Sequence, residues 1–307
     1  RKIIMKKILS TLILFFFVSA AHSATPLVEA SWLKENINNK NVKVIEISSK
    51  FVNGSYDKFK QGHIPGSVYI DHIGDKLITT QKGVIGQLPV KKELESLFSK
   101  LGVKNSDHVV VSYLGVNSLD FGSAARLYWS LKVAGHGNVS ILNGGLKAWT
   151  AAGYKLAQGE TQITPSQFKV KLNDKYVASY KDVRNAKRKK NDYALIDARP
   201  KAFFIGEKKH PKIQRAGTIP TAVNLEEATI VDGNLKVKSA DEIKALFVKS
   251  NVKGKKGYVS FCNTGWFAST VWFALSEVAG IENVKLYDGS LAHWTLNPKN
   301  EVINGQI

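Results

Sequence analysis

The sequence predicts an α/β fold made of two similar domains, and three observations support this prediction. The chain has 307 residues, more than one average domain, and 44% of them are hydrophobic, which is enough to fill two cores. Short β-branched runs alternate with longer helical patterns, and this favours parallel strands joined by crossover helices. The same series of segments also occurs twice in the same order.

The repeat consists of matching segments whose separation along the chain stays nearly constant. The matching pairs are residues 44–47 with 195–198, 62–68 with 217–223, 110–113 with 258–261, and 142–149 with 287–294. A polar stretch that begins at Gln158 separates the two copies. We therefore predict one domain at residues 24–155 and a second at residues 156–307.

The predicted strands are apolar at successive positions, as in residues 109–111. This pattern is typical of strands that are covered on both faces. Helical patterns follow at residues 124–133 in the first copy and at residues 268–279 in the second. Each domain is therefore expected to be a mainly parallel sheet flanked by helices.

Residues 1–23 have the pattern of a signal peptide with a few upstream residues. Lys6 and Lys7 precede an apolar run at residues 8–20, which is too short to span a bilayer. Small residues follow at 21–24, and we expect cleavage after Ser23. The protein is thus expected to be exported, periplasmic or secreted, without a stable membrane anchor. An uncleaved anchor is the alternative.

The formal net charge of +19 at pH 7 should attract anions. The lysines are scattered over both halves, with short basic clusters at residues 187–190 and 253–256 and no nucleic-acid-binding motif. Solvated faces account for such clusters. We therefore expect small anionic substrates as partners and no nucleic acid.

Cys262 is the only cysteine, so the chain cannot form an internal disulfide. It follows the predicted strand at residues 258–261, at the carboxyl end where parallel sheets bind ligands, and precedes the helical pattern that begins at Ala268. A glycine in the intervening turn allows positive φ and lets amide groups face the sulfur, which predicts a pocket for an anionic sulfur. The turn consists of Cys262, Asn263, Thr264, Gly265, Trp266 and Phe267.

The first copy of the repeat lacks this turn. Alignment of the two copies places Leu114 opposite Cys262, and the residues that follow, 115–121, differ in length and composition from the turn after Cys262. This difference favours a working cysteine over the alternative, which is a small core residue at the end of a strand.

Several features of the chain point to one family. They are the order of elements, the repeated Gly-x-Ile-Pro segment, the Cys-x-x-Gly turn and the Asp-Gly-Ser-x-x-x-Trp ending, and together they resemble the rhodanese family of sulfurtransferases. The resemblance covers essentially the whole chain after residue 23. It implies two tandem rhodanese-like domains, of which residues 24–155 form a non-catalytic copy and residues 156–307 the catalytic one.

The resemblance also implies a reaction. Cys262 would take sulfane sulfur from an anionic donor, thiosulfate or 3-mercaptopyruvate, and hold it as a persulfide. It would then pass the sulfur to a nucleophilic acceptor, cyanide or a thiol. This chemistry needs no metal and no cofactor besides the covalent cysteine persulfide.

Two anion-binding positions of the family carry other residues here. No Arg or Lys lies between Cys262 and Phe267, and Phe203 stands where the family's substrate arginine is expected. Thr264 occupies the place of a small hydroxyl-bearing residue in mercaptopyruvate-type members. The remaining candidates for substrate binding are Asp197, Arg199, His210 and Arg215.

Other interpretations of these residues and of the chain stay open. Asp197 and Arg199 could form an ion pair at a strand end, and residues 208–215 could be an exposed basic loop. A phosphatase is disfavoured because the turn is short and lacks the arginine that would bind phosphate. A cysteine hydrolase is disfavoured because no Cys-His-Asn arrangement is recognisable. The main alternative is a non-catalytic rhodanese-like binding or scaffold protein.

Overall fold

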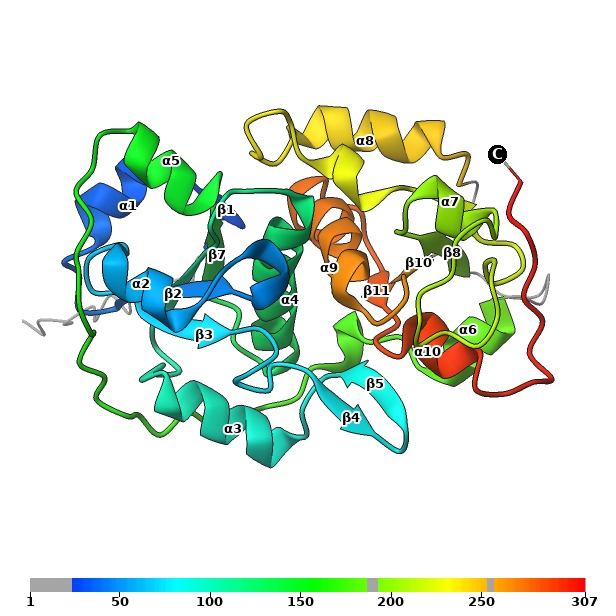
Figure 1. Cartoon of the computed structure of the whole chain (residues 1–307), viewed down its shortest axis with the longest axis horizontal. Coiled ribbons are helices and arrows are strands. Elements are labelled where there is room, and N and C mark those ends of the chain that lie inside the picture. The colour runs from blue at the N-terminus through cyan, green and yellow to red at the C-terminus, as the bar shows by residue number, and fades with distance from the viewer. Residues whose placement is uncertain (1–23, 187–192, 253–256, 307) are drawn as a thin grey trace, which may run out of the picture.

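The computed structural model describes residues 24–186, 193–252 and 257–306. The predicted signal segment at 1–23 and the basic clusters at 187–190 and 253–256 lie outside the described residues. Two α/β units lie side by side, the first at the blue end of the colour scale and the second at the red end (Figure 1). In the part of the chain that the structure describes, no helix combines the length and the apolar composition needed to span a membrane.

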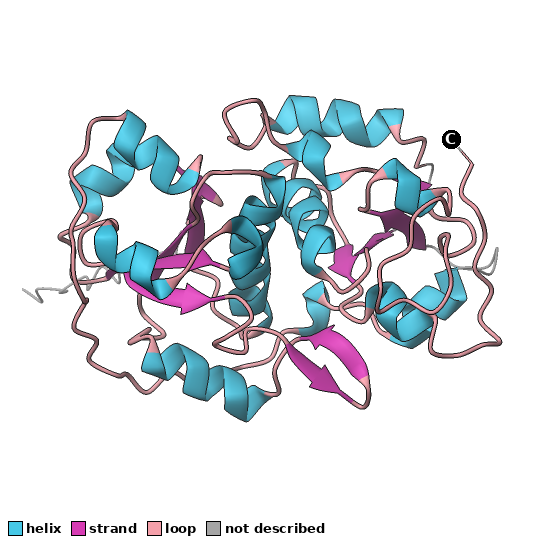
Figure 2. Ribbon diagram, in the orientation of Figure 1, coloured by secondary structure: helices cyan, strands magenta, loops and turns pink. Residues whose placement is uncertain are grey.

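The first unit contains a five-stranded sheet in the order β1-β7-β6-β2-β3, and every neighbouring pair is parallel. The strands are β1 (Leu27–Val28), β2 (Val42–Ser48), β3 (Val68–Asp71), β6 (His108–Ser112) and β7 (Val139–Leu142). The apolar run at 109–111 lies in the central strand β6 and is fully buried. This burial is expected because helices cover both faces of the sheet (Figure 2).

The second unit repeats this topology. Its sheet has the order β11-β10-β8-β9, again entirely parallel. The strands are β8 (Tyr193–Asp197), β9 (Val223–Asn224), β10 (Gly257–Phe261) and β11 (Val284–Leu286). Val177 forms a parallel bridge with Leu286, at the place where β1 pairs with β7 in the first unit. The predicted repeat and the α/β class are therefore confirmed, whereas the domain boundary near residue 155 stays a prediction.

Helices connect the strands and flank both sheets. In the first unit they are α1 (Ala30–Asn36), α2 (Tyr56–Gln61), α3 (Lys91–Lys100), α4 (Ser118–Val133) and α5 (Gly145–Ala151). In the second they are α6 (Tyr180–Ala186), α7 (Lys201–Phe204), α8 (Ala240–Lys249), α9 (Trp266–Trp272) and α10 (Ser290–Trp294). Helix α9 continues as a π-helix, Phe273–Val278. An antiparallel hairpin of β4 (Thr79–Gln81) and β5 (Val84–Gln87) projects from the first unit beneath the second (Figure 1).

One large apolar cluster of the core contains residues of both units. Helix α4 is buried on nearly all sides, as expected for a helix without a polar face, and it packs against α9 in the middle of the molecule (Figure 1). Tyr128 of α4 meets Phe273 edge to face at 4.9 Å between ring centroids, and Phe121 meets the same ring at 5.8 Å. These contacts between the units lie within the core, so the packing of the core fixes the position of one unit relative to the other.

The register of the sheets corrects one alignment made from the sequence. Asp197 pairs with Phe261 in the second sheet, and its counterpart Glu46 pairs with Ser112 in the first. The residue that follows Ser112 and matches Cys262 is therefore Tyr113. The alignment of Leu114 with Cys262 was wrong by one residue, because successive apolar residues in a buried strand resemble each other when shifted by one.

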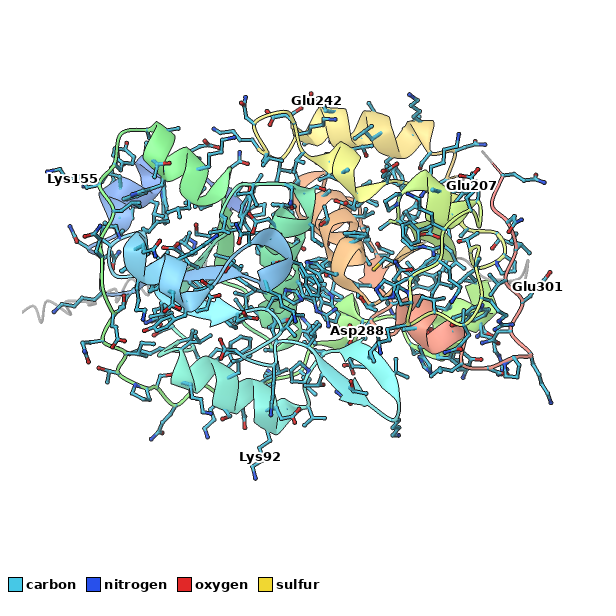
Figure 3. The ribbon with its side chains drawn as sticks, viewed as in Figure 1. Lys92, Lys155, Glu207, Glu242, Asp288 and Glu301 are labelled. Atoms are coloured by element: carbon cyan, nitrogen blue, oxygen red, sulfur yellow. The ribbon has the colours of Figure 1, made fainter. Side chains whose placement is uncertain are left out.

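A buried ion pair also joins the two units. Arg126 of α4 is fully buried, and its Nη1 lies 2.6 Å from Oδ1 of Asp288 in the second unit. The guanidinium also donates to the carbonyl of Gly86, and Asp288 Oδ2 accepts from the amide of Leu88 at 2.6 Å. Figure 3 shows Asp288 in the middle of the molecule, where little water can solvate its charge. Helix α4, the hairpin and the second unit thus meet at one charged contact.

We predict that Arg126→Met lowers the free energy of unfolding by about 3 kcal/mol, because it leaves the Asp288 carboxylate buried without a counter-charge. Urea unfolding followed by fluorescence measures this. The matched control is Lys236→Met, which breaks an exposed ion pair to Glu29 between the same two units and should cost less than about 1 kcal/mol. Equal losses in the two variants would contradict the role assigned to Arg126.

Candidate active site

Cys262 lies directly after β10, at the carboxyl end of the second sheet. The turn that follows is shorter than predicted, because α9 begins at Trp266 and not at Ala268. Gly265 precedes the helix with φ +83°, the left-handed conformation that the sequence suggested for it. Trp266 and Phe267 are therefore the first residues of α9, and this helix presents them beside the turn.

The Cys262 sulfur is buried and faces backbone amides. Burial raises the pKa of the thiol, and hydrogen bonds from the backbone of Ala268, Thr264 and Gly265 lower it, offsetting part of that effect. The net pKa stays above the ordinary thiol value. The backbone amides that the sequence predicted beside the sulfur are present. The pKa of the resting thiol is nevertheless higher than that prediction implied, because burial raises it by more than the amide hydrogen bonds lower it.

Ser290 is a site residue that the sequence analysis did not identify. Its Oγ accepts a hydrogen bond from the Cys262 backbone amide at 3.0 Å, donates to the Tyr287 carbonyl at 2.9 Å and lies 4.0 Å from Cys262 Sγ. Its φ is +48°, a conformation that costs energy for a residue with a side chain. The matching residue in the first unit is Gly145. The serine in place of this glycine is the feature of the sequence that could have identified Ser290 as a site residue.

Asp197 and Arg199 form the strand-end ion pair that was the alternative to direct substrate binding. The Arg199 guanidinium donates to both carboxylate oxygens, at 2.6 Å and 2.9 Å, and both side chains are buried. Thr218 Oγ1 donates to the same carboxylate at 2.7 Å. Arg199 Nη1 also donates to Asn263 Oδ1 at 3.3 Å. The pair thus lies behind the turn and supports Asn263, and neither residue lines the cavity described below.

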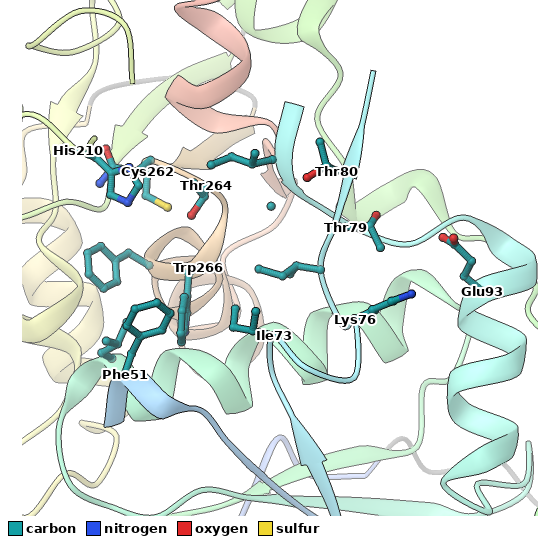
Figure 4. Close-up of a pocket in the computed structure, with 16 residues that line it drawn as sticks. Phe51, Ile73, Lys76, Thr79, Thr80, Glu93, His210, Cys262, Thr264 and Trp266 are labelled. Carbon is teal, nitrogen blue, oxygen red and sulfur yellow. The ribbon is translucent and has the colours of Figure 1, made fainter. Parts of the chain in front are cut away.

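Arg215 and His210 lie in different environments. The Arg215 guanidinium donates to backbone carbonyls of the C-terminal segment, so the structure places it in the packing of that segment and not in the cavity. His210 is half-buried and lines the cavity with Cys262 (Figure 4). Burial and the charges of Lys212, Arg199 and Lys209 lower its pKa, so the ring is neutral at neutral pH in a positive local field.

The cavity has a volume of about 720 Å³ and lies between the two units. Figure 4 shows Cys262, Thr264 and His210 at one end and Lys76 and Glu93 toward the other. The second unit contributes His210, Cys262, Asn263, Thr264, Trp266 and Phe267. Most of the remaining wall comes from the first unit, from the segments around β4, β5 and the starts of α3 and α4.

Trp266 both lines the cavity and packs against the first unit. Its ring stacks on the buried His72 at 4.0 Å with an interplanar angle of 14°, and Phe51 meets it edge to face at 6.0 Å. Burial, with the charge of Arg126, lowers the pKa of His72 to about 3, so a neutral ring supports the tryptophan. Trp266 is therefore part of the contact between the units as well as of the cavity wall.

The described residues contain no group of three or more His, Cys, Asp or Glu side chains arranged to hold a metal ion. The chemistry available from the described groups is that of one sulfur nucleophile. Backbone amides and a serine hydroxyl surround that sulfur, and the cavity in front of it can admit a substrate.

We predict that Ser290→Ala lowers the free energy of unfolding by about 1 to 3 kcal/mol, because the buried Cys262 amide loses its acceptor. Urea unfolding provides the measurement. Ser269→Ala is a matched control, since it removes a buried hydroxyl that donates to the Gly265 carbonyl and leaves no amide unpaired. A control that is as destabilised as Ser290→Ala would show that the Cys262 amide is not the reason.

Comparison with known proteins identifies the family. The model of the rhodanese-like domain matches residues 29–152 and again residues 179–297. The 3-mercaptopyruvate sulfurtransferase of Escherichia coli (strain K12) is 32% identical over 279 residues, covering 89% of this chain and 95% of the relative. The sulfur carrier protein TtuD of Thermus thermophilus is 31% identical over 277 residues, covering 87% and 93%. The crystal structure of SseA from Escherichia coli, a 3-mercaptopyruvate sulfotransferase, matches with a TM-score of 0.77 at 30% identity and covers 87% of this chain and 99% of that one. The two matched domains, the shared fold and these relatives together show that the chain belongs to the rhodanese family.

Proposed function

We propose that this protein is a sulfurtransferase that moves sulfane sulfur from an anionic donor to a nucleophilic acceptor through a persulfide on Cys262. The observation that carries the proposal is the position of Cys262 Sγ, which faces backbone amides and opens onto a cavity between the domains. The printed names of the relatives, a 3-mercaptopyruvate sulfurtransferase and a sulfur carrier protein, support the same chemistry.

The first step loads the sulfur. The Cys262 thiolate attacks the outer sulfur of the donor, an Sγ–S bond forms, and the bond that held this sulfur in the donor breaks. With thiosulfate the electron pair of that bond leaves on sulfite, and with 3-mercaptopyruvate it leaves on the pyruvate enolate. The positive charges of Lys209 and Lys212 near His210 favour approach of either anion.

The second step unloads it. Cyanide or a thiolate attacks the outer sulfur of the persulfide, and the electron pair of the Sγ–S bond returns to Cys262. In both steps the backbone amides of Thr264, Gly265 and Ala268 stabilise the negative charge on the buried sulfur. We assign Thr264 to the donor side of the cavity, where its hydroxyl can bind an oxygen of 3-mercaptopyruvate.

The two domains divide this work. The domain at 156–307 carries Cys262 and its cradle, and the domain at 24–155 is non-catalytic and builds most of the cavity wall. In the non-catalytic copy Tyr113 occupies the position of the nucleophile, and its hydroxyl accepts from the Gly144 amide at 3.0 Å. A tyrosine in this place has no sulfur to transfer.

We predict that the wild-type chain gains one sulfur atom when it is incubated with thiosulfate or 3-mercaptopyruvate, and that it yields thiocyanate when cyanide is added. Intact mass spectrometry measures the gain in mass, and Cys262 is the only cysteine that can carry a persulfide. The Cys262→Ser variant should lose both signals. A wild type that is inactive with both donors would favour the scaffold alternative.

We predict that the rate of sulfur loading rises with pH through and above the ordinary range of thiol pKa values. The reason is that the pKa of Cys262 is raised, so the fraction of reactive thiolate continues to increase there.

We also propose that the protein is exported. The support is the sequence of residues 1–23, in which a basic start, an apolar run and small residues follow one another. Amino-terminal sequencing of the protein recovered from outside the cytoplasm should begin at Ala24. Recovery of the protein only in the cytoplasm, with residues before Ala24 still attached, would refute export.

A further inference from the structure

The cavity in front of Cys262 is large for the sulfur donors that the family uses. Its volume of about 720 Å³ lies in the range of pockets that enclose whole organic ligands. Thiosulfate is hardly larger than sulfate, and 3-mercaptopyruvate is a short three-carbon acid. Either molecule would leave most of the cavity unoccupied. The size of the cavity therefore indicates that it also binds a larger substrate.

The charged residues that line the cavity lie away from the sulfur. Among the described lining residues, Lys76 is the one lysine or arginine, and it lies with Glu93 away from Cys262 (Figure 4). Lys76 and Glu93 are both exposed, with opposite charges, at the mouth of the cavity. They can bind a polar end of a ligand, but they provide no fixed cation beside the sulfur.

The wall between these ends is apolar. Trp266 and Phe267 form the side nearest Cys262, and the first domain adds Phe51, Ile73, Ile78, Ile85 and Leu119. Phe51 is 60% exposed although its ring contacts Trp266, which leaves a large aromatic surface in water next to the cavity. An exposed aromatic side chain continuous with an apolar pocket marks a place where a ligand can bury apolar surface.

We propose that the sulfur acceptor of this enzyme is a low-molecular-weight thiol with an apolar body, alkyl or aromatic. This inference rests on the proposed function and names the substrate class of the same site. The thiol sulfur lies at Cys262, and the body extends along Trp266, Ile73 and Ile78. A polar or charged group at the far end of the acceptor faces Lys76 and Glu93.

The transfer step balances without a further reactant. The acceptor thiolate attacks the outer sulfur of the protonated Cys262 persulfide and forms a new S–S bond. The Sγ–S bond breaks and its electron pair returns to Cys262, so the products are an organic persulfide, RSSH, and the Cys262 thiolate. One negative charge enters on the acceptor and one remains on the cysteine, with no change in the total number of electrons.

The first test compares acceptors of increasing apolar length on the persulfide-loaded wild type. Ethanethiol, butanethiol and hexanethiol have similar thiol acidity, so differences between them report binding of the body. We expect kcat/KM to rise by about fourfold for each added methylene, which is the effect of burying that group in an apolar site. Glutathione serves as a large polar thiol and should be a poorer acceptor than hexanethiol. Values that do not change with chain length, or a clear preference for glutathione, would overturn the inference.

The second test changes the wall. Ile78→Ser should reduce the preference for hexanethiol over ethanethiol by at least about threefold, because it makes part of the wall polar. The matched control is Val248→Ser, which alters an apolar side chain that is 74% exposed on α8, outside the cavity, and should leave this preference unchanged. An unchanged preference in Ile78→Ser would count against the assigned path of the acceptor.

The third test separates this inference from the proposed function. Methyl thioethers of the same alkyl chains cannot accept sulfur, and calorimetry measures their binding to the unloaded protein. Affinity should rise with chain length even if transfer is not observed. Failure of Cys262 to gain sulfur from either donor would refute the sulfurtransferase proposal, whereas affinity independent of chain length would refute the apolar acceptor.

Discussion

The turn after Cys262 keeps its shape because atoms of both domains approach it so closely that two glycines have no room for a side chain. A Cβ atom on Gly265 would lie 2.8 Å from Arg126 Nη1 and 3.0 Å from the Asp288 carbonyl. A Cβ atom on Gly86 would lie 2.5 Å from the Thr264 carbonyl. The buried ion pair of Arg126 and Asp288 lies at the same place and holds helix α4 against the second domain. The amides that face the sulfur are therefore positioned by both halves of the chain.

The two copies of the repeat place different partners next to one buried carboxylate. In the second copy Asp197 is neutralised by Arg199, whose guanidinium also reaches the turn. In the other copy its counterpart Glu46 has no such partner among the residues described, and burial raises its pKa to about 7. There Tyr113 takes the position of the nucleophile, with its hydroxyl hydrogen-bonded to backbone. The same topology thus places a cysteine sulfur in one copy and a packed tyrosine in the other.

The first copy contributes to the candidate site because the cavity lies between the domains. The hairpin of β4 and β5 and the start of α4 supply residues of its wall. Trp266 links the two functions of this surface, since one face stacks on His72 and another part lines the cavity. A change in the packing of the domains would therefore alter the shape of the substrate pocket as well as stability.

The sequence alone was sufficient for the fold class, the internal repeat and the position of Cys262 after a buried strand. Each of these follows from local patterns, namely strand and helix periodicity and a glycine placed where the turn needs positive φ. The sequence did not identify Ser290, because its importance lies in a left-handed backbone and a bond to an amide 28 residues away. The sequence alignment of the two copies also placed Leu114 opposite Cys262, which is wrong by one residue. Consecutive apolar residues in a strand do not show which of them align.

The amino-acid sequence by itself therefore determined the helices and strands and the position of the one cysteine. The tertiary structure alone decided that Asp197 and Arg199 support the turn, that Arg215 binds carbonyls of the C-terminal segment, and that Arg126 reaches the active site from the other domain. The physical reason is that burial, ion pairing and the walls of a cavity depend on contacts between segments far apart in the sequence, and only folding brings these segments together.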